Sequence, residues 1–222
     1  MILLFDLDGT LTDSEEGIIN AFKYTLKKMN MEERTVEELR KYIGPPLDET
    51  FRRSFNLYGE KNDEAFKYFK EYMVKGRFEN RPYYGIRELL KKYSKDNTIA
   101  LASSKNEDQA KDIIKYFKLD YFDFIGAATE DNSRSKKADV INYVLDNLNV
   151  KNKSDIYMIG DRFTDINGAK KCGLKSIGVL WGFGSEEELK NCKADYIVST
   201  VEELDHLLDK LYKKEKELEL CI

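Results

Sequence analysis

The sequence predicts an α/β fold, in which a doubly wound parallel sheet carries an inserted all-helical domain. Three observations predict this fold. Residues 2–5 form a short apolar run that is typical of a buried strand and ends in polar residues. Residues 14–77 then show helical periodicity and no convincing strand. After Arg81-Pro82, apolar strand-like runs alternate with amphipathic helical runs, which is typical of a parallel sheet covered on both faces.

The inserted domain is predicted from helical periodicity and from residues that begin or end helices. Helices are expected at residues 14–29, 35–42, 47–55 and 63–75. Ser14 is the expected N-cap of the first helix. Thr35 and Glu38 have the spacing of a capping box at the start of the second. Gly44-Pro45-Pro46 follows the second helix and should end it.

The rest of the chain is predicted to form the sheet and the helices that cover it. Strands are expected at residues 98–102, 122–125, 156–159, 175–180 and 196–198, and helices at 86–93, 107–117, 138–148, 165–172 and 201–218. The resulting division assigns residues 1–13 and 82–222 to the core and 14–81 to the insert. Because two segments, 13–16 and 78–83, connect them, we expect the insert to move as a hinged cap.

Composition excludes several classes of protein. The 222 residues are 41% hydrophobic and 35% charged, which is the balance of a globular chain. A net charge of −4 argues against a nucleic-acid partner and against an anionic membrane surface. No apolar run approaches the roughly 20 residues that span a bilayer, and no secretory signal follows Met1. The three cysteines are widely separated, which fits a reducing compartment, so we expect a cytoplasmic protein.

Polar residues follow the predicted strands at their carboxyl ends. They are Asp6 and Asp8 after residues 2–5, Ser103, Ser104 and Lys105 after 98–102, Arg134 to Lys137 after 122–125, and Asp161 and Asp165 after 156–159. Because the carboxyl ends of parallel strands meet at one edge of a sheet, we expect these side chains to converge. Each segment alone has a structural explanation as a turn or a helix start. All of them in this order favour an oxygen-ligated Mg²⁺ site beside a phosphate site.

These segments also carry a family resemblance that covers the whole chain. The motifs are FDLDGTLTDS, LASSK, SKKAD and IGDRFTDINGAKKCG. With them the chain resembles the haloacid dehalogenase superfamily of phosphotransferases and, within it, the phosphoglycolate-phosphatase-like group. The resemblance implies a Rossmann-like catalytic core with an all-helical cap domain inserted after the first strand, which agrees with the periodicity described above.

The resemblance implies a role for each motif residue. Asp6 corresponds to the nucleophile and Asp8 to the general acid/base. The implied metal ligands are Asp6, Asp8 through its backbone carbonyl, Asp161 and Asp165, and the implied phosphate-binding residues are Ser103, Ser104 and Lys137. Family members usually show Lys-Pro at the third motif, whereas this chain has Lys136-Lys137-Ala138. Lys136 is therefore the alternative to Lys137.

The chemistry explains why two carboxylates are spaced two residues apart. Asp6 must be ionised to attack phosphorus and form an aspartyl-phosphate. Asp8 should first donate a proton to the departing alcohol and then take one from the attacking water. A metal ion and a lysine would offset the negative charge that the two carboxylates bring together.

The expected function is therefore that of a Mg²⁺-dependent phosphomonoesterase acting on a small soluble phosphate ester. Phosphoglycolate, a sugar phosphate or a nucleoside monophosphate would suit such a site. The alternative is a phosphomutase of the beta-phosphoglucomutase type, because residues 101–106 are reminiscent of that group. No nucleic acid or membrane partner is expected, and the protein should be a monomer or a weak homodimer.

Substrate choice is expected to depend on the insert, since the core motifs handle only the phosphoryl group. The candidate specificity residues are Gly44 and Pro45, in a stiff Gly-Pro-Pro turn, and the neighbouring Arg40. A rigid connector between two helices is the alternative interpretation of this turn.

Overall fold

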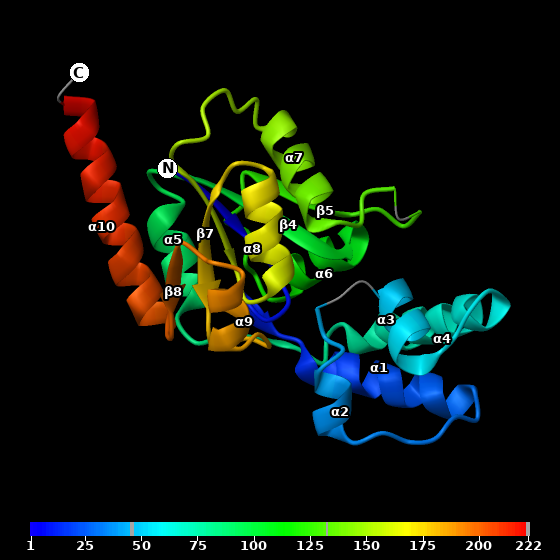
Figure 1. The fold of residues 1–222 in the computed structure, drawn as a ribbon. Helices are drawn as coiled ribbons and strands as arrows, with labels where there is room; N and C mark the ends of the chain where they lie inside the picture. The colour runs from blue at the N-terminus through cyan, green and yellow to red at the C-terminus, as the bar shows by residue number, and fades with distance from the viewer. Residues whose placement is uncertain (45–46, 132, 221–222) are drawn as a thin grey trace. The chain divides into compact units, whose positions relative to one another are not determined.

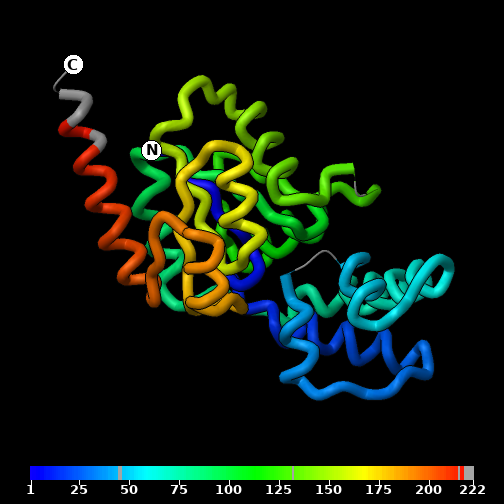
Figure 2. Tube along the Cα trace, viewed as in Figure 1, coloured from blue at the N-terminus to red at the C-terminus, as the bar shows by residue number. Residues whose placement is uncertain are grey.

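The computed structural model of the chain describes residues 1–44, 47–131 and 133–220 (Figure 1). Two compact units are present. The core unit consists of Met1–Leu11 and Pro82–Ile222, and the insert unit consists of Thr12–Arg81. Figure 2 follows the chain from the core unit through the insert unit and back. Within the described ranges, no helix is both long and apolar enough to cross a membrane.

A six-stranded, fully parallel sheet forms the centre of the core unit, as predicted. Its strand order is β5-β4-β1-β6-β7-β8. The strands are β1 (Ile2–Phe5), β4 (Thr98–Asn106), β5 (Phe124–Ala128), β6 (Ile156–Gly160), β7 (Lys175–Val179) and β8 (Tyr196–Val198). The chain runs outward from β1 through β4 to β5 and then continues at β6, on the other side of β1. Ligands of open α/β sheets bind at the carboxyl ends of the strands where the order reverses in this way.

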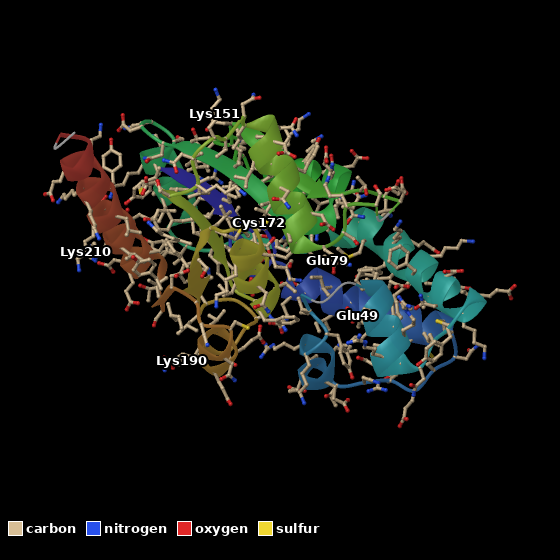
Figure 3. The ribbon with its side chains drawn as sticks, turned by 45° about the horizontal axis from the view of Figure 1, so that its top comes forward. Glu49, Glu79, Lys151, Cys172, Lys190 and Lys210 are labelled. Carbon is tan, nitrogen blue, oxygen red and sulfur yellow. The ribbon has the colours of Figure 1, made fainter. Side chains whose placement is uncertain are left out.

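Helices cover both faces of this sheet, which explains why its strands are apolar on both sides. One face packs against α5 (Ile86–Tyr93), α6 (Glu107–Tyr116) and α10 (Val201–Leu220). The other face packs against α7 (Lys137–Asn147) and α8 (Phe163–Lys171), where the buried Cys172 lies (Figure 3). A short helix, α9 (Glu186–Asn191), places Leu189 over Gly178 of β7. Both faces of the sheet are therefore covered by helices.

The insert unit is helical apart from its ends. It contains α1 (Glu15–Lys28), α2 (Val36–Arg40), α3 (Leu47–Phe55) and α4 (Glu60–Gly76). Gly17 brings α1 and α4 together, because a Cβ at this position would lie 2.2 Å from the carbonyl oxygen of Gly76. Phe22 is the centre of the aromatic core, with its ring 5.0 Å from that of Phe69. Glu79 (Figure 3) also ties the helices, since it accepts hydrogen bonds from Asn20 and Tyr72.

The chain leaves and re-enters the core unit through two short strands that pair with each other. These strands are β2 (Thr12–Asp13) and β3 (Arg81–Pro82). Arg81 and Asp13 form an ion pair of 2.9 Å. On the core side of this pair, the Tyr83 amide donates to the Leu11 carbonyl at 3.1 Å. The two connections predicted from the sequence are therefore one hydrogen-bonded junction.

Several element ends differ from prediction for identifiable reasons. The first helix begins at Glu15, and the Ser14 side chain makes no capping bond because its backbone (φ −97°, ψ 11°) is not extended. The Thr35–Glu38 capping box is present as predicted. β4 continues through its polar end to Asn106, where its register with β5 shifts. Helix α9 was not predicted, since its six residues are too few to show periodicity.

Candidate active site

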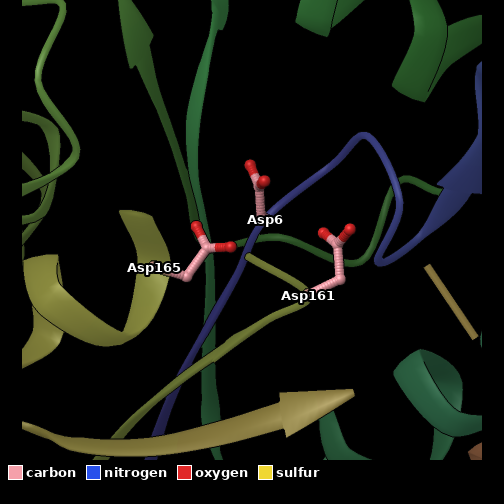
Figure 4. Close-up of side chains that lie close together, drawn as sticks. All are labelled: Asp6, Asp161 and Asp165. Atoms are coloured by element: carbon pink, nitrogen blue, oxygen red, sulfur yellow. The ribbon is translucent and has the colours of Figure 1, made fainter. Parts of the chain in front are cut away.

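Three carboxylates meet at the carboxyl edge of the sheet. Asp6 follows β1, and Asp161 and Asp165 follow β6, which is the neighbour of β1 with Phe5 opposite Ile159. Figure 4 shows the three side chains turned toward a common space, and one ligand oxygen of each lies within 4.8 Å of the other two. The sequence therefore predicted correctly that these acids converge.

The loop after β1 can approach Asp161 only because residue 9 is glycine. Gly9 has φ +81°, and a Cβ at this position would lie 2.3 Å from Asp161 Oδ2. The next residue, Thr10, donates from its hydroxyl to Asp161 Oδ1 at 3.1 Å. The Gly-Thr pair of the first motif thus holds this loop against the fourth motif.

Asp161 and Asp165 are both fully buried. Asp161 Oδ2 accepts a hydrogen bond of 2.8 Å from the Phe183 amide, and Asp165 Oδ2 accepts one of 3.0 Å from the Arg162 amide. Burial raises the pKa of Asp161 to about 8, and the carboxylates of Asp165 and Asp6 add to this rise. Asp161 is therefore costly to ionise unless a cation lies beside it.

Lys137 supplies a cation to the other two acids of the cluster, Asp6 and Asp165. Its side chain is 3% exposed, and its Nζ lies 2.8 Å from both Asp6 Oδ1 and Asp165 Oδ1. The ammonium also donates to the Ala102 carbonyl at 3.0 Å. Burial alone would lower the pKa of Lys137, but the carboxylates of Asp165 and Asp6 hold it above its usual value. The predicted alternative, Lys136, is exposed.

The ionisation of Asp6 reflects the same balance. Burial is the largest effect on its pKa and raises it, the Lys137 ammonium opposes the rise, and the net pKa is about 6. The nearby carboxylates of Asp165 and Asp8 also raise it. One lysine therefore does not offset the negative charge of the cluster.

The donor set of this cluster fits Mg²⁺. Carboxylate oxygens are the ligands that this ion prefers in proteins, and two of the three acids, Asp161 and Asp165, are fully buried. The raised pKa of Asp161 is a second sign, because a bound divalent cation would remove the cost of its ionisation. Asp6, Asp161 and Asp165 are the residues that could hold the ion.

Asp8 does not join the three-carboxylate cluster through its side chain. Its carboxylate contacts Lys105 instead, with Nζ 2.9 Å from Oδ2 and 3.2 Å from Oδ1. Lys105 is 7% exposed and Asp8 is 20% exposed at their side chains. Sequence reasoning placed Lys105 at this edge but assigned it no role. The lysine restrains the direction in which the Asp8 carboxylate points.

The two predicted phosphate-binding hydroxyls lie at the end of β4. Ser103 is 1% exposed, and its hydroxyl accepts a hydrogen bond from the Lys105 amide at 3.3 Å. Ser104 is half-buried beside it. The strand pairing of β4 with β1 places both residues at the same sheet edge as Asp6.

Sequence reasoning missed a second loop that contacts the cluster. Residues 181–184 follow β7 and bring the Phe183 amide to Asp161, while the indole N–H of Trp181 donates to the Thr10 carbonyl at 3.0 Å. Two glycines, Gly182 and Gly184, flank Phe183 directly after an apolar strand. That pattern at the same sheet edge was the available signal.

The predicted specificity residues lie in the insert unit. Arg40 of α2 forms a bidentate ion pair with Glu15 of α1, with its Nη2 2.6 and 2.9 Å from the two carboxylate oxygens. Gly44 is exposed and has φ +110°. Pro45 lies outside the described residues. Their role in substrate choice remains a prediction.

Comparison with known proteins gives the family of the chain. Residues 3–179 match the haloacid dehalogenase-like hydrolase family. The chain belongs to this family. A 5'-nucleotidase from Pseudomonas aeruginosa is 37% identical over 191 residues, which cover 85% of this chain and 86% of that protein. Haloacid dehalogenase-like phosphatases are the enzymes that the motifs predicted, so the predicted enzyme class is confirmed.

Two further relatives of this haloacid dehalogenase-like hydrolase extend the comparison. The crystal structure of a predicted phosphatase from Clostridium acetobutylicum has a TM-score of 0.90 and 44% identity, covering 94% of this chain and 98% of that one. The tyrosine-protein kinase PtkA from Mycobacterium tuberculosis is 32% identical over 212 residues, which cover 93% of this chain and 72% of that protein. The similarity to both relatives covers core and insert together.

Proposed function

We propose that this phosphatase hydrolyses a small phosphate monoester with the help of Mg²⁺, through an aspartyl-phosphate on Asp6. The observation that carries this proposal is the position of the Asp6 carboxylate. It lies 2.8 Å from the Lys137 ammonium and beside two further buried acids, at the strand order reversal of the sheet. The proposed nucleophile, cation and metal ligands would thus share one site.

The metal site would be formed by the carboxylates of Asp6, Asp161 and Asp165, together with the backbone carbonyl of Asp8. When bound, Mg²⁺ would neutralise negative charge on the oxygens of the transferring phosphoryl group. Lys137 would neutralise charge on the same group, and the hydroxyls of Ser103 and Ser104 would donate hydrogen bonds to it.

The reaction would use the two acids of the first motif in turn. A carboxylate oxygen of Asp6 attacks phosphorus, the bond from phosphorus to the ester oxygen breaks, and Asp8 gives its proton to the departing alcohol. Asp8 then takes a proton from water, the water oxygen attacks phosphorus, and the bond to Asp6 breaks to release inorganic phosphate. The Lys105 contact bears on this role only by restraining the position of the Asp8 carboxylate.

We further propose that residues 1–13 and 82–222 form the catalytic core and that residues 14–81 form a cap that selects the leaving group. The support is that every candidate phosphate and metal residue lies in the core unit. These residues would contact groups that all phosphomonoesters share, so they could not discriminate among esters. Gly44, Pro45 and Arg40 are the first positions at which to look for selectivity.

The test is phosphate release from a panel of esters, with and without Mg²⁺. Nucleoside 5'-monophosphates belong in the panel because of the 5'-nucleotidase relative. Phosphoglycolate, sugar phosphates and an aryl phosphate complete it. Mg²⁺-dependent release of phosphate is expected for at least one alkyl ester. Interconversion of sugar phosphate isomers without net release would instead favour the phosphomutase alternative.

Replacing Asp8 with asparagine should slow hydrolysis of alkyl esters by roughly 10²–10⁴-fold, the usual effect of losing a general acid/base. Aryl phosphates should lose less in the first step, because their leaving groups need little protonation. Rapid-quench measurement of aspartyl-phosphate formation from both kinds of ester would check this. An equal loss in the formation step for alkyl and aryl esters would contradict the acid role of Asp8.

Binding of Mg²⁺ should release protons at pH 7. The pKa of Asp161 is raised from 3.8 to about 8, so the metal-free protein holds this carboxyl protonated at pH 7, whereas a metal ligand must be ionised. Metal affinity should therefore rise with pH up to about 8. By the same linkage, the metal-free protein should lose stability as the pH rises from 3.8, the ordinary pKa of the carboxyl, to about 8, its pKa in the folded protein.

Calorimetric titration with Mg²⁺ at pH 7, in buffers that differ in ionisation enthalpy, measures the released protons directly. The observed heat should depend on the buffer at pH 7 and much less at pH 9. Equal heats in all buffers at pH 7 would show that no buried carboxyl is deprotonated on binding.

A further inference from the structure

The segment from Trp181 to Glu188 contacts Asp161 and also the two residues that follow Asp161 in the chain. It begins after β7 and runs into α9, and we call it the β7–α9 segment. Its first half contacts Asp161 and the loop after β1. Its second half contacts the residues between Asp161 and Asp165.

The first half of the segment is packed too closely for side chains at its glycines. A Cβ on Gly182 would lie 2.2 Å from the Gly9 carbonyl oxygen, and one on Gly184 would lie 1.9 Å from the Asp161 carbonyl oxygen. Between them, the Phe183 amide donates to Asp161 Oδ2. This half therefore fixes the direction of the Asp161 carboxylate.

The second half of the β7–α9 segment ends at Glu188, and one oxygen of its carboxylate accepts two hydrogen bonds. Oε1 of Glu188 accepts 2.8 Å from the amide of Phe163 and 2.9 Å from Nε of Arg162. Phe163 is the first residue of α8, so its amide has no partner within the helix. Arg162 and Phe163 are also the residues through which the chain passes from Asp161 into the helix that carries Asp165.

Glu188 is itself held in place. Its backbone amide donates to the hydroxyl oxygen of Ser185, the N-cap of α9, at 3.1 Å, and Leu189 next to it is fully buried. Hydrogen bonds from N–H groups to a carboxylate are stronger than those to a neutral acceptor. An anchored carboxylate at this point therefore fixes where the chain enters α8, and with it the spacing between Asp161 and Asp165.

We infer that Glu188 is a positioning residue that sets the Mg²⁺ affinity of the Asp6–Asp161–Asp165 cluster. The inference rests on the proposed metal site. The inference adds a residue to the proposed site, because the Glu188 carboxylate accepts hydrogen bonds from Arg162 and Phe163, which are not candidate metal ligands. Residues that orient metal ligands in this way typically change metal affinity by about 10–100-fold when they are replaced.

The experiment is a Mg²⁺ titration of the substrate-free protein, followed by calorimetry and by the shift of the melting temperature. Glu188→Ala should raise the Mg²⁺ dissociation constant by about 10-fold or more. Glu188→Gln keeps one carbonyl acceptor for the Phe163 amide, so it should raise the constant less. Glu187→Gln is the matched control, because Glu187 is the exposed neighbour in the same helix, and it should behave as wild type.

A second readout separates metal affinity from damage to the site. Phosphate release by Glu188→Ala should require more Mg²⁺ for half-maximal rate, while kcat at saturating Mg²⁺ should stay close to wild type. If Glu188→Ala does not fold, the Glu188→Gln titration carries the test alone. A lower melting temperature in metal-free Glu188 variants with an unchanged Mg²⁺ dissociation constant would assign Glu188 a structural role and overturn the inference.

The wild-type titration distinguishes this failure from failure of the proposed function. Mg²⁺ binding by wild type, with the same affinity in the Glu188 variants, contradicts the inference alone. No Mg²⁺ binding by wild type contradicts the proposed metal site, and the inference falls with it.

Discussion

Asp6→Asn should abolish phosphate release, lowering kcat by about 10⁴-fold or more, because an amide cannot attack phosphorus. The fold should survive, since the asparagine side chain has the same shape as that of aspartate. The backbone N–H of residue 6 would also still donate to the Ile159 carbonyl, as it does at 2.9 Å in the wild type. Removing one buried negative charge beside Asp161 and Asp165 should also leave the metal-free protein no less stable. Steady-state phosphate release and thermal unfolding measure the two effects.

Asp120→Asn is the matched control for this variant, because Asp120 is an exposed aspartate of the same core unit. It should retain wild-type activity. Mass spectrometry of acid-quenched wild type should detect a phosphorylated Asp6 peptide, and Asp6→Asn should lack it. A folded Asp6→Asn protein with near wild-type turnover would show that another group is the nucleophile.

Lys137→Met should produce the largest loss of stability among the site variants, about 3–5 kcal/mol. The change removes the ammonium that lies 2.8 Å from Asp6 and Asp165 and leaves both carboxylates without their cation in a buried site. Activity should fall as well, because the same ammonium would neutralise the transferring phosphoryl group.

The loss of stability in Lys137→Met should depend on pH in a defined direction. Asp6 has its pKa raised to about 6 even with the lysine present, and removing the cation raises it further. Protonation relieves the unpaired charge, so the variant should be least destabilised below pH 6 and most destabilised above it. Urea denaturation at pH 5 and at pH 8 would measure the difference.

Lys136→Met is the control that separates the two adjacent lysines. Lys136 is exposed, whereas Lys137 is buried against the acids. The control should unfold at the wild-type urea concentration and retain activity. Loss of activity in Lys136→Met, with a stable and active Lys137→Met, would assign the phosphate-binding role to Lys136 instead.

Much of the fold and of the acid cluster could be predicted because the signals are local. An apolar run such as residues 2–5 needs no partner to be recognised as a buried strand, and parallel strands place Asp6 and Asp161 at one edge. The preference for Lys137 over Lys136 as the phosphate-binding lysine also had a local basis, because Ala138 was expected to open the following helix, and this role stays a prediction. These predictions depend on periodicity and topology, which the chain displays without any tertiary contact.

The contacts that could not be predicted join residues far apart in the chain. Helix α8 starts at Phe163, earlier than expected, where the distant Glu188 accepts the first amide. The pairing of Lys105 with Asp8 depends on the approach of β4 to β1 in three dimensions. Neither contact leaves a pattern in the spacing of neighbouring residues, so periodicity gives no sign of them.

The paired strands β2 and β3 have a consequence for how such a chain can be rearranged. Because the insert's two ends already lie together, bonded by Arg81 and Asp13, the folded insert adds little loop-closure entropy to the folding of the core. Leu11 and Tyr83 are joined by a backbone hydrogen bond, so a short turn could connect these two residues directly if the insert were removed. The junction should therefore allow the insert to be exchanged or removed. Another folded domain with adjacent termini, or a simple turn, could occupy the same position in the chain without altering the strand order of the sheet.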